Sequence, residues 1–139
     1  MTERDYSSTP LPKKLGVREG SRVLIVAAPK GFGRTLGELP QGAEIKHRAR
    51  APIDVVILFV TEMRELRKRF DQLAEVLDPA GRLWIAWPKK AAKADTDLTF
   101  EIVQKVGLDA GLVDNKSAAI DATFQGLQFV QRVRDRPGR

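Results

Sequence analysis

The chain has 139 residues, of which 42% are hydrophobic and 30% are charged. This length and composition fit one soluble globular domain with its own hydrophobic core. Cysteine is absent, which excludes disulfides, cysteine-based zinc sites and thiol nucleophiles, and we expect a reducing, cytoplasmic compartment. The apolar run Val55 to Val60 is too short to cross a bilayer, and the polar residues at 1–10 do not resemble a signal peptide.

The net charge of +6 comes from 24 Lys and Arg against 18 Asp and Glu. Such an excess can favour an acidic partner or nucleic acid. Four of the arginines lie in the last eight residues, however, and no block of five consecutive basic residues occurs, so nucleic acid is not the expected partner. We predict a flexible segment at 1–12, one domain at 13–133 and a basic, disordered tail at 134–139.

The first half of the chain alternates apolar runs with glycine and proline. A short helical turn is predicted within 13–20, followed by a buried strand at 23–28, which is continuously apolar. Pro29 to Gly33 breaks this strand, and a short helix is plausible at 33–39. A weak, half-polar strand is predicted at 43–47.

The middle of the chain predicts a strand, a helix and a second strand. Residues 53–60 are the strongest strand, and Thr61 is a candidate N-cap for the helix after it. Apolar residues at spacings of three and four define one face of that helix: Met63, Leu66, Phe70, Leu73 and Leu77. The sequence at 78–81 predicts a turn that stops the helix, and residues 83–87 are the next strand.

The last third predicts another helix, capped by Asp95 or Thr96 and reaching about Ala110, and then two strands at 113–120 and 127–133. The short connection at 121–126 implies that these two strands are antiparallel. Trp84 and Trp87 are three residues apart on one strand, so we expect them in the core on opposite faces of the sheet.

Strands that alternate with helices predict an α/β fold. We expect a small Rossmann-like three-layer sandwich, with a mostly parallel sheet, an antiparallel C-terminal strand and helices on both faces.

Residues 54–133 resemble the second half of a class I S-adenosylmethionine-dependent methyltransferase, with Pro79-Ala80-Gly81 at its turn and 83–87 as its fifth strand. The whole chain resembles a family of small bacterial proteins, DUF3052. The segments that carry this second resemblance are Tyr6 to Leu11, Lys13 to Gly16, Trp84 to Lys90, Asp97 to Thr99 and Asp121 to Val130. Both resemblances imply a methyltransferase-like Rossmann fold, and neither supplies an established activity for this chain.

The chain departs from the methyltransferase pattern where that family binds its cofactor. The glycine-containing turn carries Pro29 and Lys30 in place of small residues. The second strand ends in Lys46 and His47, where the resemblance implies an acidic residue that holds the ribose. The third strand and its helix are missing before Pro52. His47 has no evident metal-binding partners and is interpreted as a surface residue.

The candidate ligand site lies at the carboxyl ends of three strands, where doubly wound sheets bind their ligands. The loops after these strands are predicted to form a basic cleft for an acidic ligand. The cleft residues are Lys30, Gly31, Gly33, Arg34, Thr61, Trp87, Lys89 and Lys90, with Lys93 nearby. The alternative is that these lysines only keep the loops soluble.

The sequence therefore predicts an uncharacterised, non-catalytic domain that binds an acidic small molecule or a protein. One alternative is a reduced methyltransferase that binds S-adenosylmethionine through Gly31 and Gly33. Another is weak binding of nucleic acid. Helix capping accounts for Asp95 and Asp97, and turn chemistry accounts for Asp121.

Overall fold

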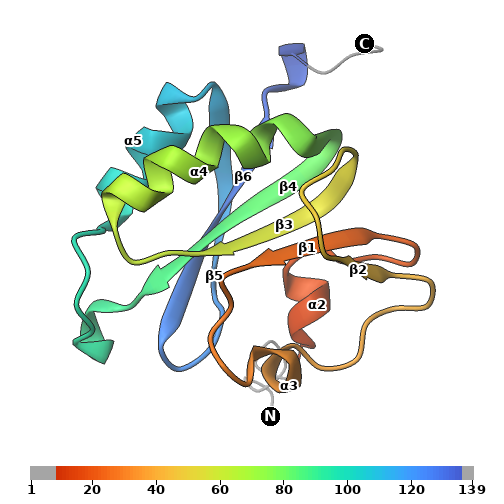
Figure 1. Ribbon diagram of the computed structural model, residues 1–139, viewed down its shortest axis with the longest axis horizontal. Coiled ribbons are helices and arrows are strands. Elements are labelled where there is room, and N and C mark those ends of the chain that lie inside the picture. The colour runs from red at the N-terminus through yellow and green to blue at the C-terminus, as the bar shows by residue number, and fades with distance from the viewer. Residues whose placement is uncertain (1–8, 136–139) are drawn as a thin grey trace.

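The computed structural model describes residues 9–135, in which six strands form one sheet (Figure 1). The strands are β1 (Arg22–Val26), β2 (Glu44–Lys46), β3 (Ile53–Phe59), β4 (Leu77–Pro88), β5 (Leu112–Ala119) and β6 (Phe124–Gln131). Their order across the sheet is β2-β1-β3-β4-β6-β5. The first four strands are parallel, and β6 is antiparallel to both of its neighbours. The predicted α/β class and the antiparallel C-terminal strand are confirmed.

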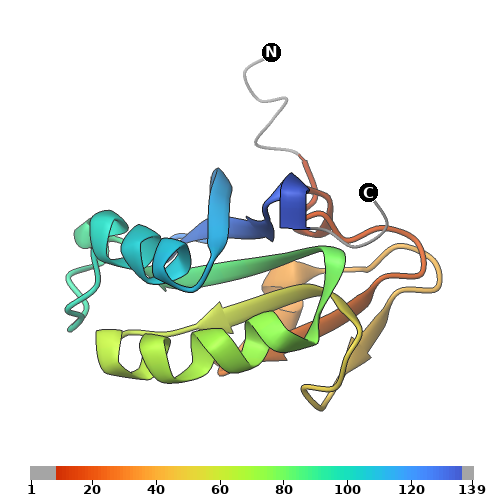
Figure 2. The same cartoon turned by 90° about the horizontal axis from the view of Figure 1, so that it is seen from above.

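Helices cover both faces of the sheet and make it the middle of three layers. The long helices α4 (Met63–Val76) and α5 (Phe100–Asp109) lie together on one face, as Figures 1 and 2 show. The short helices α2 (Leu11–Lys14) and α3 (Phe32–Leu36) pack on the other face. Two 3-10 turns, η1 (Lys90–Ala92) and η2 (Val133–Asp135), complete the elements. None of the helices within residues 9–135 has the length and apolar character needed to span a membrane.

The core lies on both sides of the central strand β3, which explains why that strand is apolar almost throughout. Val56 and Leu58 face α4 and α5, whereas Val55 and Ile57 face α2 and α3. On β4, Trp84 and Trp87 are 0% and 2% exposed and belong to opposite sides. The prediction that both tryptophans are core residues on opposite faces is confirmed.

Helix α4 ends before Asp78, as predicted, but β4 begins directly after it, so residues 78–81 lie in the strand and not in a turn. Ile53 pairs with Leu77, the register then shifts, and Val55 pairs with Arg82. The carboxylate of Asp78 accepts a hydrogen bond from the backbone N–H of Ala80 within this irregular stretch. A Cβ at Gly81 would lie 2.9 Å from the carbonyl oxygen of Asp54, so the glycine lets the two strands approach.

The predicted ends of the domain also shift. Helix α2 begins at Leu11, inside the segment that the sequence predicted to be flexible. At the other end, η2 extends into the predicted tail. The remainder of both predicted segments, residues 1–8 and 136–139, lies outside the described residues.

The caps of α4 and α5 differ from those predicted. Thr61 does not cap α4. Instead, a carboxylate oxygen of Asp97 accepts a 2.8 Å hydrogen bond from the backbone N–H of Met63, across 34 residues of sequence. Thr99, and not Asp95 or Thr96, caps α5, because its hydroxyl accepts from the N–H of Ile102. The hydroxyl of Thr96 donates to the carbonyl of Thr61, which ties the same two loops together.

Replacing Asp97 with alanine should lower the free energy of unfolding by about 1 kcal/mol, the typical cost of losing a helix cap. Urea denaturation followed by circular dichroism measures this change. Asp95→Ala is the matched control, because Asp95 is exposed and bonds to nothing in the described part of the chain. Equal losses in the two variants would show that Asp97 acts through its charge and not through the cap.

Candidate functional site

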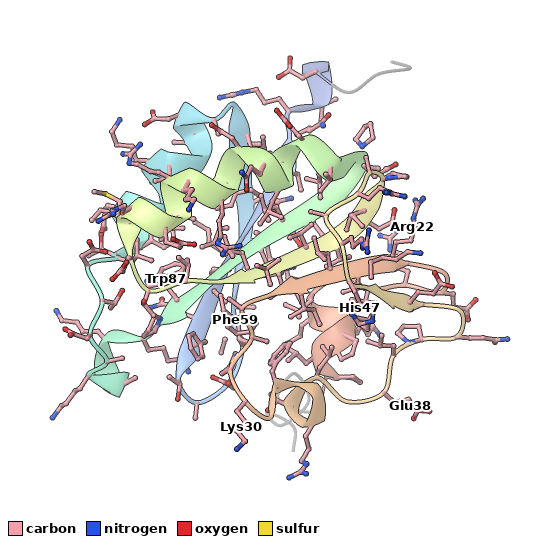
Figure 3. All side chains as sticks on the ribbon, viewed as in Figure 1. Arg22, Lys30, Glu38, His47, Phe59 and Trp87 are labelled. Atoms are coloured by element: carbon pink, nitrogen blue, oxygen red, sulfur yellow. The ribbon has the colours of Figure 1, made fainter. Side chains whose placement is uncertain are left out.

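The carboxyl ends of β1, β3 and β4 lie side by side at one edge of the sheet, as the sequence predicted. In sheets of this kind, ligands bind at that edge. Figure 3 shows Phe59 and Trp87 toward this end of the sheet, whereas Arg22 lies at the opposite end. Two separate cavities open along the carboxyl edge.

The first, which we call the carboxyl-edge cavity, lies between β1, β3, α4 and the start of β6 and has a volume of about 340 Å³. Its lining includes Ala27, Pro29, Phe59, Val60, Thr61, Glu62, Glu65, Arg69 and Phe124. Of the residues predicted from sequence, only Thr61 lines it.

The second, which we call the lysine cavity, has a volume of about 430 Å³ and lies between the end of β4, the start of α5 and the β5–β6 hairpin. It includes three predicted residues, namely Trp87, Lys89 and Lys90, together with the half-exposed ring of Phe100. The predicted residues are therefore divided between two cavities and do not form one basic cleft.

The other four predicted residues, Lys30, Gly31, Gly33 and Arg34, line neither cavity. Ala27 has a φ of 60° and Gly31 a φ of 86°, so the chain turns sharply as it leaves β1. After this turn, α3 packs on the face of the sheet that also carries α2, and Phe32 and Leu36 are buried there. Lys30 and Arg34 are exposed as a result, and Figure 3 shows Lys30 pointing away from the sheet.

Three phenylalanines form the apolar floor beside the carboxyl-edge cavity. The ring of Phe59 packs edge-to-face against Phe32, with ring centroids 4.8 Å apart, and against Phe124 at 5.1 Å. Edge-to-face pairs are favourable and orient the rings. Neither Phe32 nor Phe124 is among the site residues predicted from the sequence. In the sequence, each of them is only an aromatic residue within a predicted turn.

The wall of the same cavity is polar and comes from the first turns of α4. Glu65 and Arg69 form an ion pair one helical turn apart. The hydrogen bond from Arg69 lowers the pKa of the Glu65 carboxyl below its ordinary value, against the opposing effect of burial. Glu65 is therefore ionised and paired at neutral pH, which suits it to binding and makes it a poor general base.

The position that holds ribose in dinucleotide and methyltransferase folds is also changed. Strand β2 has only three residues and ends at Lys46, which pairs with Glu44 at 2.9 Å. Residues 47–52 then lead directly into β3, so the prediction that a strand and its helix are missing is confirmed. Because basic residues follow β2, no carboxylate stands where a ribose would be bound.

Comparison with solved structures identifies the fold. A TehB-like S-adenosylmethionine-dependent methyltransferase from Corynebacterium glutamicum is 11% identical, with a TM-score of 0.60 over 88% of this chain and 85% of that one. A fibrillarin pre-rRNA processing protein from Methanococcus jannaschii is 12% identical, with a TM-score of 0.61 over 83% of this chain and 68% of that one. A methyltransferase from Aquifex aeolicus is 18% identical, with a TM-score of 0.54 over 93% of both chains.

These similarities establish a class I methyltransferase-like fold, and at such low identities they establish the fold alone. No family model and no curated protein matches the chain. The resemblance to DUF3052 therefore stays a prediction.

Proposed function

We propose that this chain is a non-catalytic, ligand-binding domain built on a reduced methyltransferase-like fold, and that its ligand occupies the carboxyl-edge cavity. The proposal rests on the residues that line this cavity. Its floor is apolar, with Phe59 and Phe124, and its wall carries the Glu65–Arg69 ion pair and the carboxylate of Glu62, which pairs with no cation within residues 9–135. This lining suits a small molecule with an apolar or aromatic body and a cationic or hydrogen-bond-donating group.

S-adenosylmethionine is the first compound to test, because it combines an aromatic base with a sulfonium cation. The carboxylate of Glu62 would face its cationic part, and Phe59 and Phe124 would contact its apolar part. The fit covers only part of the cofactor, since Lys46 and His47 follow β2 where an acid would hold the ribose. We therefore expect binding without methyl transfer, and the ion-paired state of Glu65 supports this expectation.

Isothermal calorimetry with S-adenosylmethionine and S-adenosylhomocysteine tests the proposal. We expect the first to bind more tightly, since only it carries the sulfonium charge. Thr61→Trp should abolish binding, because Thr61 is exposed and a large side chain there would fill the cavity without disturbing the core. Gly33→Ala is the control. Gly33 lies outside the cavity, and a Cβ there meets no atom within 4 Å.

Three outcomes would count against the proposal. If the folded protein binds neither compound, ligands of the adenosylmethionine type are excluded. If Thr61→Trp and Gly33→Ala bind as tightly as the original chain, the ligand sits elsewhere. Methyl transfer to any acceptor would show that the domain is catalytic.

A second candidate is favoured by the lysine cavity. Lys89 and Lys90 are its only charged lining residues, and Ser117 and Gln125 add polar groups. This lining suits an acidic small molecule or an acidic segment of a protein partner, the ligand class that the sequence predicted. The two candidates differ in the sign of the ligand's charge, so a dicarboxylate and S-adenosylmethionine distinguish them. For a dicarboxylate, Lys89→Ala/Lys90→Ala should weaken binding.

A further inference from the structure

A third cavity lies beside the start of β1 and the end of the short edge strand β2, and it is strongly basic. It has a volume of about 530 Å³ and lies between the start of β1 and the connection from β2 to β3. All of its charged or titratable lining residues are basic by type: Arg22, Lys46, His47, Arg48 and Arg50. Ala51 and Pro52 complete the wall. We call it the basic cavity, and Figure 3 shows Arg22 and His47 in this region.

The protein itself neutralises only part of this charge. Arg22 makes a two-pronged ion pair with Asp54, with nitrogen–oxygen distances of 2.8 and 3.0 Å. Lys46 pairs with Glu44. Arg48 and Arg50 are exposed and make no ion pair or side-chain hydrogen bond within residues 9–135. Two guanidinium groups beside one cavity are thus left for an external anion.

The backbone of the connection from β2 to β3 places Arg48 and Arg50 close together. Residues 47–52 form a six-residue connection in place of the missing strand and helix, and the N–H of Arg50 donates to the carbonyl of Arg48 at 2.9 Å. This turn brings the two residues to the same short bend. The apolar wall of Ala51 and Pro52 and the ion-paired Arg22 form the rest of the cavity.

A neighbouring cavity is lined by carboxylates as well as guanidinium groups, whereas the basic cavity has no carboxylate among the described residues that line it. It shares Arg22 and adds Arg18 and Arg82, but it is also lined by Glu19, Asp54 and Asp78. Its three carboxylates balance its three guanidinium groups. An anion is therefore expected in the basic cavity and not in the mixed one, because only the former has uncompensated positive charge.

From this arrangement we infer that the basic cavity binds a phosphate-bearing small molecule. Guanidinium groups match phosphate oxygens with paired hydrogen bonds, and Arg48 and Arg50 together balance a doubly charged phosphate. The cavity has the volume of a small-molecule site. Its apolar wall, Ala51 and Pro52, can contact a non-phosphate part of the ligand. Within residues 9–135, the site shares no lining residue with the carboxyl-edge cavity.

Binding of inorganic pyrophosphate and ATP, measured by calorimetry at fixed ionic strength, tests this inference. Arg48→Ala/Arg50→Ala should weaken binding by more than about tenfold, as expected when charged hydrogen bonds are lost. Both side chains are exposed, so the variant should fold normally, and circular dichroism checks this. Lys30→Ala/Arg34→Ala is the matched control. It removes the same charge from exposed positions outside the basic cavity and should change the affinity by less than about twofold.

Amide chemical shifts in a nuclear magnetic resonance titration should move at residues 46–50 and not in α3. Equal weakening in the two double variants would overturn the inference, because it would show a response to net charge alone. Absence of pyrophosphate and ATP binding by the original chain would also overturn it. If a single-stranded oligonucleotide bound through Arg48 and Arg50 while both small phosphates did not, the site would be a nucleic-acid contact instead.

Discussion

Replacing Trp84 with alanine should lower the free energy of unfolding by about 3–5 kcal/mol, the range for large aromatic residues removed from a core. Trp84 is fully buried on the face of the sheet that carries α2 and α3. Its indole N–H donates a 2.9 Å hydrogen bond to the carbonyl of Leu15. The substitution removes the packing volume and also leaves this buried carbonyl without its partner. Urea denaturation followed by far-ultraviolet circular dichroism measures the loss.

Trp84→Phe separates the two contributions. It keeps an aromatic ring in the core and removes the hydrogen bond to Leu15, so it should cost less than the alanine substitution. A loss below about 1 kcal/mol for Trp84→Ala would contradict the packing described here, since a surface position gives values of that size.

Replacing Gly107 with alanine should destabilise the protein by about 1–3 kcal/mol, although alanine is the better helix former. Gly107 lies in α5 against the sheet, and a Cβ there would be 2.0 Å from Cε2 of Phe129. Phe129 is fully buried and packs edge-to-face on Phe70, with ring centroids 5.3 Å apart. Because its ring is buried and in contact with Phe70, we expect the cost of overpacking to exceed the gain in helix propensity. Thermal or urea denaturation measures the difference.

The same substitution at Gly33 is the matched control. Gly33 also lies in a helix, but a Cβ there meets nothing within 4 Å. Gly33→Ala should leave stability unchanged or raise it by up to about 1 kcal/mol. If both substitutions stabilise the protein, α5 does not approach Phe129 as closely as described.

The sequence predicted the elements whose signal is local. The apolar runs at β1 and β3 and the three-and-four spacing of α4 depend on neighbouring residues only. The structure confirms all three within a few residues, together with the antiparallel hairpin and the two buried tryptophans. Gly111, which follows the C-cap of α5, has a φ of 94°, as expected just after a helix C-terminus.

The errors concern features that depend on distant parts of the chain. Asp97 caps α4 from 34 residues away, which no local pattern reveals. The early start of β4 depends on pairing with Ile53. The predicted site residues are not grouped in one cleft for the same reason. The strand ends were located correctly, but the path of the loop after β1 decides whether Lys30 faces the cavity. Its sharp turn at Ala27 and Gly31 directs that side chain outward instead.

Strand β2 has one further consequence, for association between molecules. Edge strands expose unpaired backbone groups, and long, flat edges invite pairing with another chain. Here the edge has three residues, flanked by Ala43 and His47, and two of the three are the charged residues Glu44 and Lys46. The single apolar residue, Ile45, is only 36% exposed. This edge of the sheet, left by the missing strand, is thus a poor template for pairing with another chain.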